Sequence, residues 1–168
     1  MIDAGLLPYV IALIAGFCVK IVDWVDDDKK GKNPIKWPLA ILYGLLIGYL
    51  ISTASFSVLF LAAVVAQVFA RKIDTRAHIL GVAVTAISML YFGLAPIPYN
   101  FFAYFLILAF LDEADFIGKL RPLEKYRIVL KVGALLMVLV GRWDFFAGII
   151  AFDIGYELFN QVQTRILK

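Results

Sequence analysis

Two pairs of aspartates in this chain have the residue type and the spacing of a site for a cation or a phosphate. Asp23 and Asp26 are three positions apart, and Asp112 and Asp115 repeat this spacing further along the chain. Residues three apart lie on the same face of a helix. Carboxylate oxygens suit Mg²⁺ or Ca²⁺, especially where a substrate phosphate supplies further oxygens. We therefore predict that these four aspartates are ligands of Mg²⁺ or another divalent cation.

The aspartate pairs belong to a longer internal repeat. When the chain is shifted by 89 positions against itself, five charged residues fall on residues of the same charge, and Gly44 falls on Gly133. The five matches are Asp23 with Asp112, Asp26 with Asp115, Lys30 with Lys119, Lys32 with Arg121 and Lys36 with Lys125. Apolar matches arise readily by chance in a hydrophobic sequence, whereas five charged matches in one register do not. The sequence therefore predicts a duplicated unit that carries the acidic pair twice.

Two further acids lie within an apolar segment. Asp153 falls near the middle of a predicted helix over 144–163, and Glu157 follows one turn later on the same face. An ionisable group at that depth in a membrane costs several kcal/mol unless it is paired or hydrated, so it is a functional candidate. The repeat aligns these acids with Val64 and Val68. Because only one half carries the acids, we predict one asymmetric site in which Asp153 or Glu157 is a ligand or general base.

Basic residues near the same end of the predicted helices could hold a phosphate. Lys20 and Lys131 lie one turn inside the membrane, where an ammonium could contact a phosphate or extend to the headgroup region. A lysine could instead pair with Asp153 and hold two helices together. His78, the one histidine, lies four residues after Asp74. A histidine–carboxylate pair can act as a proton shuttle or a metal ligand, but a histidine at a helix start often does neither.

The composition indicates which elements must position these groups. With 63% hydrophobic and 17% charged residues, the chain is predicted to be an all-α integral membrane protein. Its apolar segments must be helical because lipid offers no water to the backbone. The polar stretches 52–55 and 141–144 are expected to break helices at matching places in the two halves. We predict seven transmembrane helices, at roughly 5–25, 37–53, 56–74, 78–94, 98–116, 127–140 and 144–163; the second and sixth are short for a crossing that needs about 20 residues.

The predicted helices form one membrane domain, 1–168, with a 3+1+3 plan. Three-helix repeats over 5–74 and 95–163 flank a linker helix over 78–94, which makes the two repeats parallel. Of the 16 basic residues, 15 fall on one side and only Arg142 on the other. The positive-inside rule then places the amino terminus outside and the carboxyl terminus in the cytoplasm of a multi-pass cell-membrane protein.

Charge and cysteine content exclude several classes of function. The net charge is +3, but the basic residues lie between hydrophobic runs, where they meet anionic lipid headgroups, so no nucleic-acid partner is expected. The single cysteine, Cys18, excludes an intrachain disulfide and a cysteine metal cluster. Membrane lipid is the expected partner, and the sequence leaves a homo-oligomer open.

Three functions fit these patterns. The first is a divalent-cation-dependent enzyme that transfers or hydrolyses phosphate on a phosphorylated or nucleotide-activated lipid at the cytoplasmic interface. The second is a transporter or channel for a cation or small solute, built from parallel repeats. The third is a scaffold or assembly protein whose acids only pair with lysines. We favour the enzyme because the outer half of the bundle offers little polar lining beyond Thr85, Ser88 and Asn100.

Overall fold

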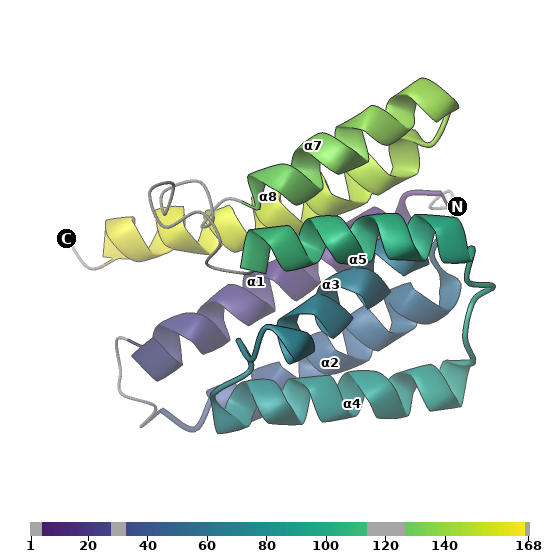
Figure 1. Ribbon diagram of the computed structural model, residues 1–168. Coiled ribbons are helices and arrows are strands. Elements are labelled where there is room, and N and C mark those ends of the chain that lie inside the picture. Colours follow the sequence, from purple (N-terminus) through teal and green to yellow (C-terminus); the bar gives the residue numbers. More distant parts are fainter. Residues whose placement is uncertain (1–4, 28–32, 114–126, 167–168) are drawn as a thin grey trace.

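The computed structural model describes residues 5–27, 33–113 and 127–166, and these form helices and no strand. The predicted all-α class is confirmed. The helices, drawn in Figure 1, are α1 (Leu7–Asp27), α2 (Lys36–Thr53), α3 (Ser57–Phe69), α4 (Arg76–Phe92), α5 (Tyr99–Glu113), α7 (Ile128–Leu136), the 3-10 helix η1 (Met137–Val140) and α8 (Trp143–Ile166). Five residues of the charge repeat lie outside the described residues, in addition to Asp115: Lys30, Lys32, Lys119, Arg121 and Lys125.

Two helices, α1 and α2, are long and apolar enough to cross a membrane. Three further apolar stretches are shorter, namely α3, α4 and the combined run Ile128–Val140. The predicted count of seven crossings is therefore not confirmed. The described residues show an all-helical protein with two helices of membrane-spanning length.

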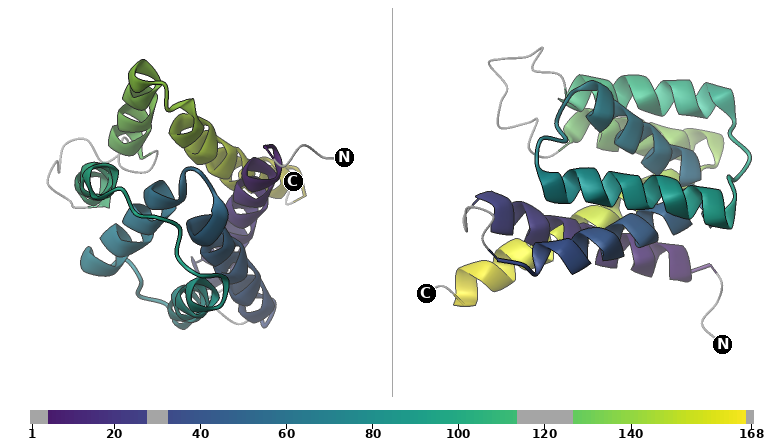
Figure 2. Two further views of the ribbon diagram at one scale, coloured as in Figure 1. Left: turned by 90° about the vertical axis from the view of Figure 1, so that its right-hand side faces the viewer. Right: turned by 90° about the horizontal axis from the view of Figure 1, so that it is seen from below.

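The two predicted repeats are intermixed in space. Helix α1 packs against α8, and α5 packs against α3, so the first helix of each half lies on the last helix of the other (Figures 1 and 2). The middle helices α2 and α7 each contact both of the other helices of their own half. The helix between the halves, α4, packs along α2. Residues far apart in the sequence are thereby brought together at the helix ends.

The contact between α1 and α8 depends on two glycines. A Cβ atom at Gly16 would overlap the backbone carbonyl of Phe152, and one at Gly155 would overlap the carbonyl of Leu13. Small residues of this kind let two helix backbones touch. This crossing sets the carboxyl-terminal half of α1 beside α8, which positions Asp23 for the contacts described below.

Candidate functional site

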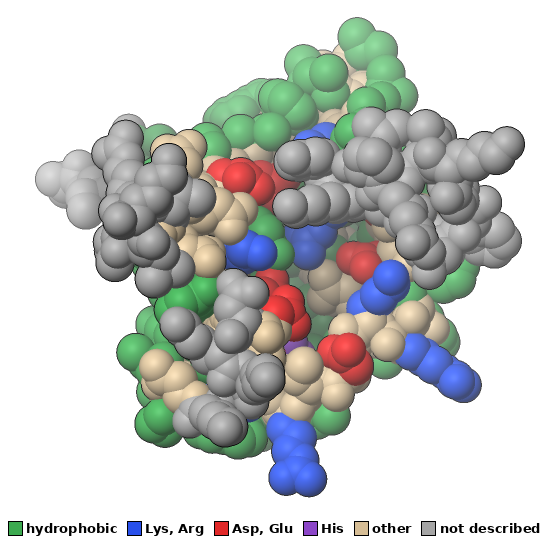
Figure 3. Space-filling model, turned by 90° about the vertical axis from the view of Figure 1, so that its left-hand side faces the viewer, with side chains coloured by type: hydrophobic (Ala, Val, Ile, Leu, Met, Phe, Trp, Pro, Cys, Tyr) green, Lys and Arg blue, Asp and Glu red, His purple; other side chains and the backbone are tan. Residues whose placement is uncertain are grey.

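A pocket of about 190 Å³ lies between the helices at the end of the bundle where α1, α3 and α5 end and α4 begins. In the end-on view, acidic and basic side chains surround a hollow (Figure 3). The polar lining comes from helix ends and loops, and includes Asp23, Gln67, Lys72, His78, Glu113 and Arg127. The apolar lining lies one or more turns deeper, and includes Val19, Ile47, Phe60, Val64, Val82 and Phe152. The pocket therefore has a charged mouth above an apolar interior.

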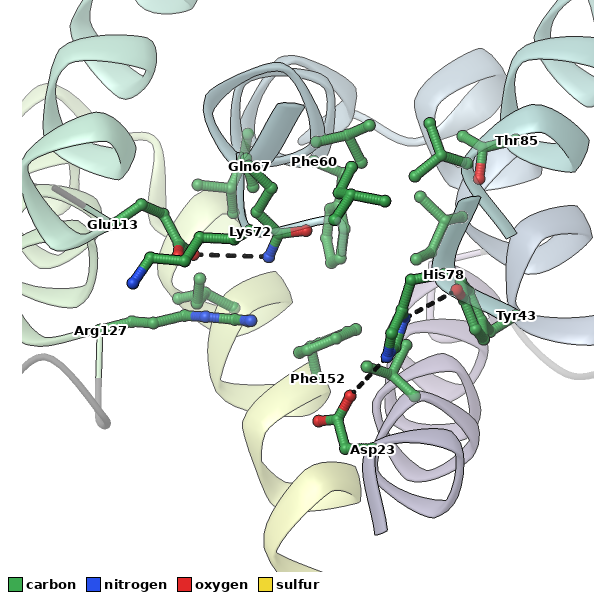
Figure 4. Close-up of a pocket in the computed structure, with 18 residues that line it drawn as sticks. Asp23, Tyr43, Phe60, Gln67, Lys72, His78, Thr85, Glu113, Arg127 and Phe152 are labelled. Carbon is green, nitrogen blue, oxygen red and sulfur yellow. Dashed lines mark hydrogen bonds and ion pairs between the residues drawn. The ribbon is translucent and has the colours of Figure 1, made fainter. Parts of the chain in front are cut away.

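One wall of the pocket is a hydrogen-bonded network centred on Asp23. His78 Nε2 lies 2.9 Å from one carboxylate oxygen, and the Tyr156 hydroxyl donates to the other at 2.6 Å. The second ring nitrogen of His78 lies 3.0 Å from the Tyr43 hydroxyl (Figure 4). Lys20 Nζ is 3.4 Å from the Tyr156 hydroxyl. Residues of α1, α2, α4 and α8 thus fix the position and orientation of the imidazole.

This network can exist in two protonation states. With neutral His78, Nε2–H donates to Asp23 and Nδ1 accepts from the Tyr43 hydroxyl. With protonated His78, both ring nitrogens donate, and the Tyr43 hydroxyl hydrogen becomes available to a ligand. The wall can therefore hold one additional proton on His78 without losing its hydrogen bonds.

The opposite wall gathers an acid, an amide and two cations. Gln67 Nε2 is 3.4 Å from a Glu113 carboxylate oxygen, and Arg127 and Lys72 lie beside them in Figure 4. The Arg127 guanidinium carbon is 5.6 Å from the centre of the Phe152 ring. Within the part of the chain that the structure describes, no ion pair holds Lys72 or Arg127.

Backbone strain occurs beside the same wall. Arg127 has φ 48° and Arg71 has φ 55°, and among the described residues these are the non-glycine positions with positive φ. A left-handed conformation costs an L-residue about 1–2 kcal/mol. Arg127 lines the pocket and Arg71 directly precedes Lys72. Strain of this kind is often found at functional sites, where the surrounding structure maintains it.

The predicted metal ligands do not come together in the described residues. Asp26 pairs with Lys36 at 2.6 Å. Asp112 accepts the backbone N–H groups of Val129 at 3.0 Å and Leu130 at 2.6 Å. No group of three or more His, Cys, Asp or Glu side chains that could hold a metal is found in 5–27, 33–113 or 127–166. Asp115 lies outside the described residues, so a divalent cation at these positions stays a prediction.

The other predicted site residues are also dispersed. Asp153 pairs with Lys131 at 2.6 Å, which is the helix-to-helix ion pair that the sequence offered as an alternative. Glu157 is exposed and accepts a hydrogen bond from Asn160 at 3.1 Å. Of the eight predicted site residues, Asp23 lines the pocket directly, and Lys20 reaches it through Tyr156.

Sequence reasoning missed most of the pocket lining. The sequence suggests Asp74 as the partner of His78; in the structure Asp74 is exposed, and the imidazole contacts Asp23 instead. Tyr43 and Tyr156 were overlooked because tyrosines in apolar segments are common. Glu113 stands next to Asp112, and this adjacency is the signal that could have drawn attention to it.

Comparisons with known proteins provide no family for the chain. No protein-family model, no curated protein and no solved structure matches it. The function is therefore inferred from the pocket and its charges.

Proposed function

We propose that this is a multi-pass membrane protein that binds the phosphorylated headgroup of a lipid at its cytoplasmic end and transfers or hydrolyses phosphate there. The observation that carries the proposal is the pocket, whose mouth holds Lys72 and Arg127, which have no ion pair in the described residues, beside the acids Asp23 and Glu113, above an apolar interior. A phosphorylated lipid has the complementary distribution of charge and hydrocarbon.

The distribution of apolar side chains supports a membrane location. Leu90, Tyr91 and Leu139 are 85%, 83% and 84% exposed on outward faces, whereas Thr85 and Ser88 are each only 2% exposed. Exposed apolar surface of this kind is unfavourable in water and favourable in lipid. The 13-residue helix α3 is shorter than a crossing of about 20 residues, but much of it is buried against other helices and so does not face lipid.

The charges at the pocket mouth support binding of an anion. Asp23 already accepts hydrogen bonds from Tyr156 and His78, so both of its oxygens have partners within the protein, and its charge is neutralised when His78 is protonated. Lys72 and Arg127 have no such partner among the described residues. A phosphate between them would supply one, and Arg can bind phosphate oxygens with two parallel N–H donors.

The Asp23–His78–Tyr43 network could support phosphoryl chemistry. A histidine that a carboxylate orients can hold or deliver a proton near neutral pH. The Tyr43 hydroxyl, which also lines the pocket, can donate to a phosphate oxygen when His78 is protonated. In this proposal Asp23 positions the imidazole, and Lys72 and Arg127 neutralise the phosphate.

In this proposal a divalent cation binds together with the phosphate of the substrate and not at a separate site formed by the protein alone. Mg²⁺ bound to a phosphate neutralises and orients it. The carboxylates of the pocket lining are Asp23 and Glu113. Since both oxygens of Asp23 accept hydrogen bonds, Glu113 is the better candidate to contact a cation that arrives with the phosphate.

The binding step is tested by varying the headgroup at constant chain length. Purified protein in phosphatidylcholine nanodiscs is expected to bind dodecyl phosphate more tightly than dodecanol. Arg127→Gln and Lys72→Gln should each weaken phosphate binding by about tenfold, because each removes one charge-assisted contact. Arg76→Gln is the matched control, since Arg76 is exposed at the same end and does not line the pocket. Equal binding of both lipids, or an equal loss in the control, would contradict the proposal.

Turnover is measured separately, as release of inorganic phosphate from a lipid phosphate or pyrophosphate with and without Mg²⁺. His78→Gln should lower the rate by about a hundredfold or more while the lipid still binds, because general acid–base catalysis contributes a factor of that size. Binding without turnover in the wild-type protein would remove the enzyme from the proposal.

A further inference from the structure

Two helices that line the pocket, α3 and α4, pack mainly on other helices. Helices α3 and α4 follow one another in the chain, but α3 packs on α5 while α4 packs on α2, and in the described residues α3 and α4 make few contacts with each other at most. Both nevertheless line the pocket, α3 with Phe60 and Ala63, and α4 with Val82 and Thr85. Figure 4 shows Phe60 of α3 between Gln67, which points towards Glu113, and His78 of α4.

The apolar lining extends along the bundle axis between these helices. Phe60 and Gln67 are seven residues apart on α3, and His78 and Thr85 are seven apart on α4. At 1.5 Å per residue, each wall runs about 10 Å from the charged mouth into the apolar interior. Most of the polar residues stand at one end of this slot; the deeper lining is apolar except for Thr85, whose hydroxyl donates to the backbone carbonyls of Gly44 and Gly81.

The pocket is too small to enclose a whole lipid. Its volume is about 190 Å³, whereas sites that enclose a drug-sized ligand have about 300–1,000 Å³. A lipid whose phosphate lies at Lys72 and Arg127 must therefore extend most of its hydrocarbon outside the pocket. The residues of α3 and α4 that line the pocket below its mouth are mostly apolar, so hydrocarbon could lie between these two helices.

We propose that a lipid phosphate enters sideways between α3 and α4 and that a single hydrocarbon chain lies in this opening, with the phosphate at Lys72 and Arg127. This inference rests on the function proposed above and adds the class of substrate, a long single-chain lipid phosphate. Its occupant follows from the apolar walls, the small volume and the cations at one end.

The test varies chain length at a constant headgroup. In phosphatidylcholine nanodiscs, affinity for butyl, octyl and dodecyl phosphate should rise by up to about fourfold per buried methylene until the slot is filled. Ala63→Trp and Val82→Trp should remove this rise, so that dodecyl phosphate binds no more tightly than butyl phosphate. Ile87→Trp is the matched control, because Ile87 is 64% exposed on α4 and does not line the pocket.

A second measurement does not depend on how the tryptophan variants fold. An alkyl phosphate with a photoreactive diazirine at the chain end should label α3 and α4 of the wild-type protein, as read by mass spectrometry. Labels on α5 or α7 instead, or the same chain-length dependence in Ala63→Trp and Ile87→Trp, would overturn the sideways entry. Butyl phosphate binding would in that case leave the proposed function standing, whereas failure of every alkyl phosphate to bind would overturn both.

Discussion

Both carboxylate oxygens of Asp112 accept hydrogen bonds from the first turn of α7, and the side chain is 8% exposed. The helix needs this help because Arg127, which precedes it in a left-handed conformation, supplies no side-chain cap. The first N–H groups of a helix have no partner within the helix, and a carboxylate there also interacts favourably with the helix dipole. Asp112 thus caps α7 from α5.

Replacing Asp112 by Asn should lower the stability of the protein. The amide keeps one acceptor oxygen but turns an NH₂ group towards a backbone donor, and the lost bond is worth about 1–2 kcal/mol. The melting temperature in detergent should fall by several degrees relative to Asp74→Asn, a control at an exposed acid of the same end. If the melting temperature is unchanged and only Mg²⁺ stabilisation disappears, Asp112 is a metal ligand and not a cap.

At the scale of single residues, the sequence indicated some residues of the site but not the groups that they contact. The repeat aligned Asp23 with Asp112, but Asp23 contacts His78 and Tyr156 while Asp112 contacts backbone N–H groups. Partners depend on which helix comes alongside, and the repeat carries no information on that. The side-chain spacing of each acidic pair was therefore insufficient to predict a cation site.

Among the elements, α7 and α8 are joined by the ion pair of Lys131 and Asp153. The two side chains are 25% and 19% exposed, so the pair is partly shielded from water. In the first half the repeat places Leu42 and Val64 at the matching positions. A charged pair in one half thus stands where the other half has an apolar pair.

The double substitution Lys131→Leu with Asp153→Val should be nearly neutral for stability. Each single substitution leaves one partly buried charge without its partner and should cost about 2 kcal/mol, less than the 3–5 kcal/mol of a fully buried pair. A double-mutant cycle from denaturation in detergent measures the difference. Lipid phosphate binding should survive the double substitution. Loss of binding without loss of stability would show that Asp153 acts in the site.

Helix boundaries could be predicted where the sequence contains breaking residues. The stretch 52–55 separates α2 from α3, and 141–144 covers the start of α8, as expected. The small residues Ala12 and Gly16, and likewise Ala151 and Gly155, have the four-residue spacing of close helix contacts, but this spacing does not specify which helix is the partner, so the crossing of α1 over α8 could not be predicted. Without that crossing, the contact between Asp23 and Tyr156 could not be anticipated.

For the whole molecule, the charge distribution agrees with the proposed orientation. The described basic residues other than Arg142 lie towards one end, in or near the ends of helices that border the pocket. Arg142, at the opposite end, donates to both carboxylate oxygens of Asp144 at 3.0 Å and lies 4.2 Å from the centre of the Phe145 ring. Its charge is therefore neutralised locally, which explains how it can be the exception to the positive-inside rule.

The orientation is tested by labelling single cysteines with a membrane-impermeant maleimide. In a Cys18→Ala background, Arg76→Cys should react only from the cytoplasmic side and Tyr99→Cys only from the outside. Both positions are exposed, and Tyr99 is 82% exposed near the opposite end. Reaction of both from the same side would contradict the proposed orientation.

Composition and charge were sufficient at this scale to predict an all-helical chain with its basic residues at one end. The predicted number of membrane crossings is not confirmed, because several helices are shorter than the apolar segments from which they were predicted. The sequence could not predict which helices of one half pack against which helices of the other. A repeat shows which helices are equivalent, but not which of them are in contact.

That pairing has a consequence for biosynthesis. Helix α1 is the first described helix in the chain and α8 is the last. Because α1 packs on α8, the face of α1 that contacts α8 stays uncovered until α8 has been synthesised. During translation Gly16 and Asp23 would be held by the insertion machinery, by lipid or by a chaperone until α8 arrives. Assembly of the pocket is then a late event, and a nascent chain interrupted before Trp143 would be a target for quality-control proteolysis.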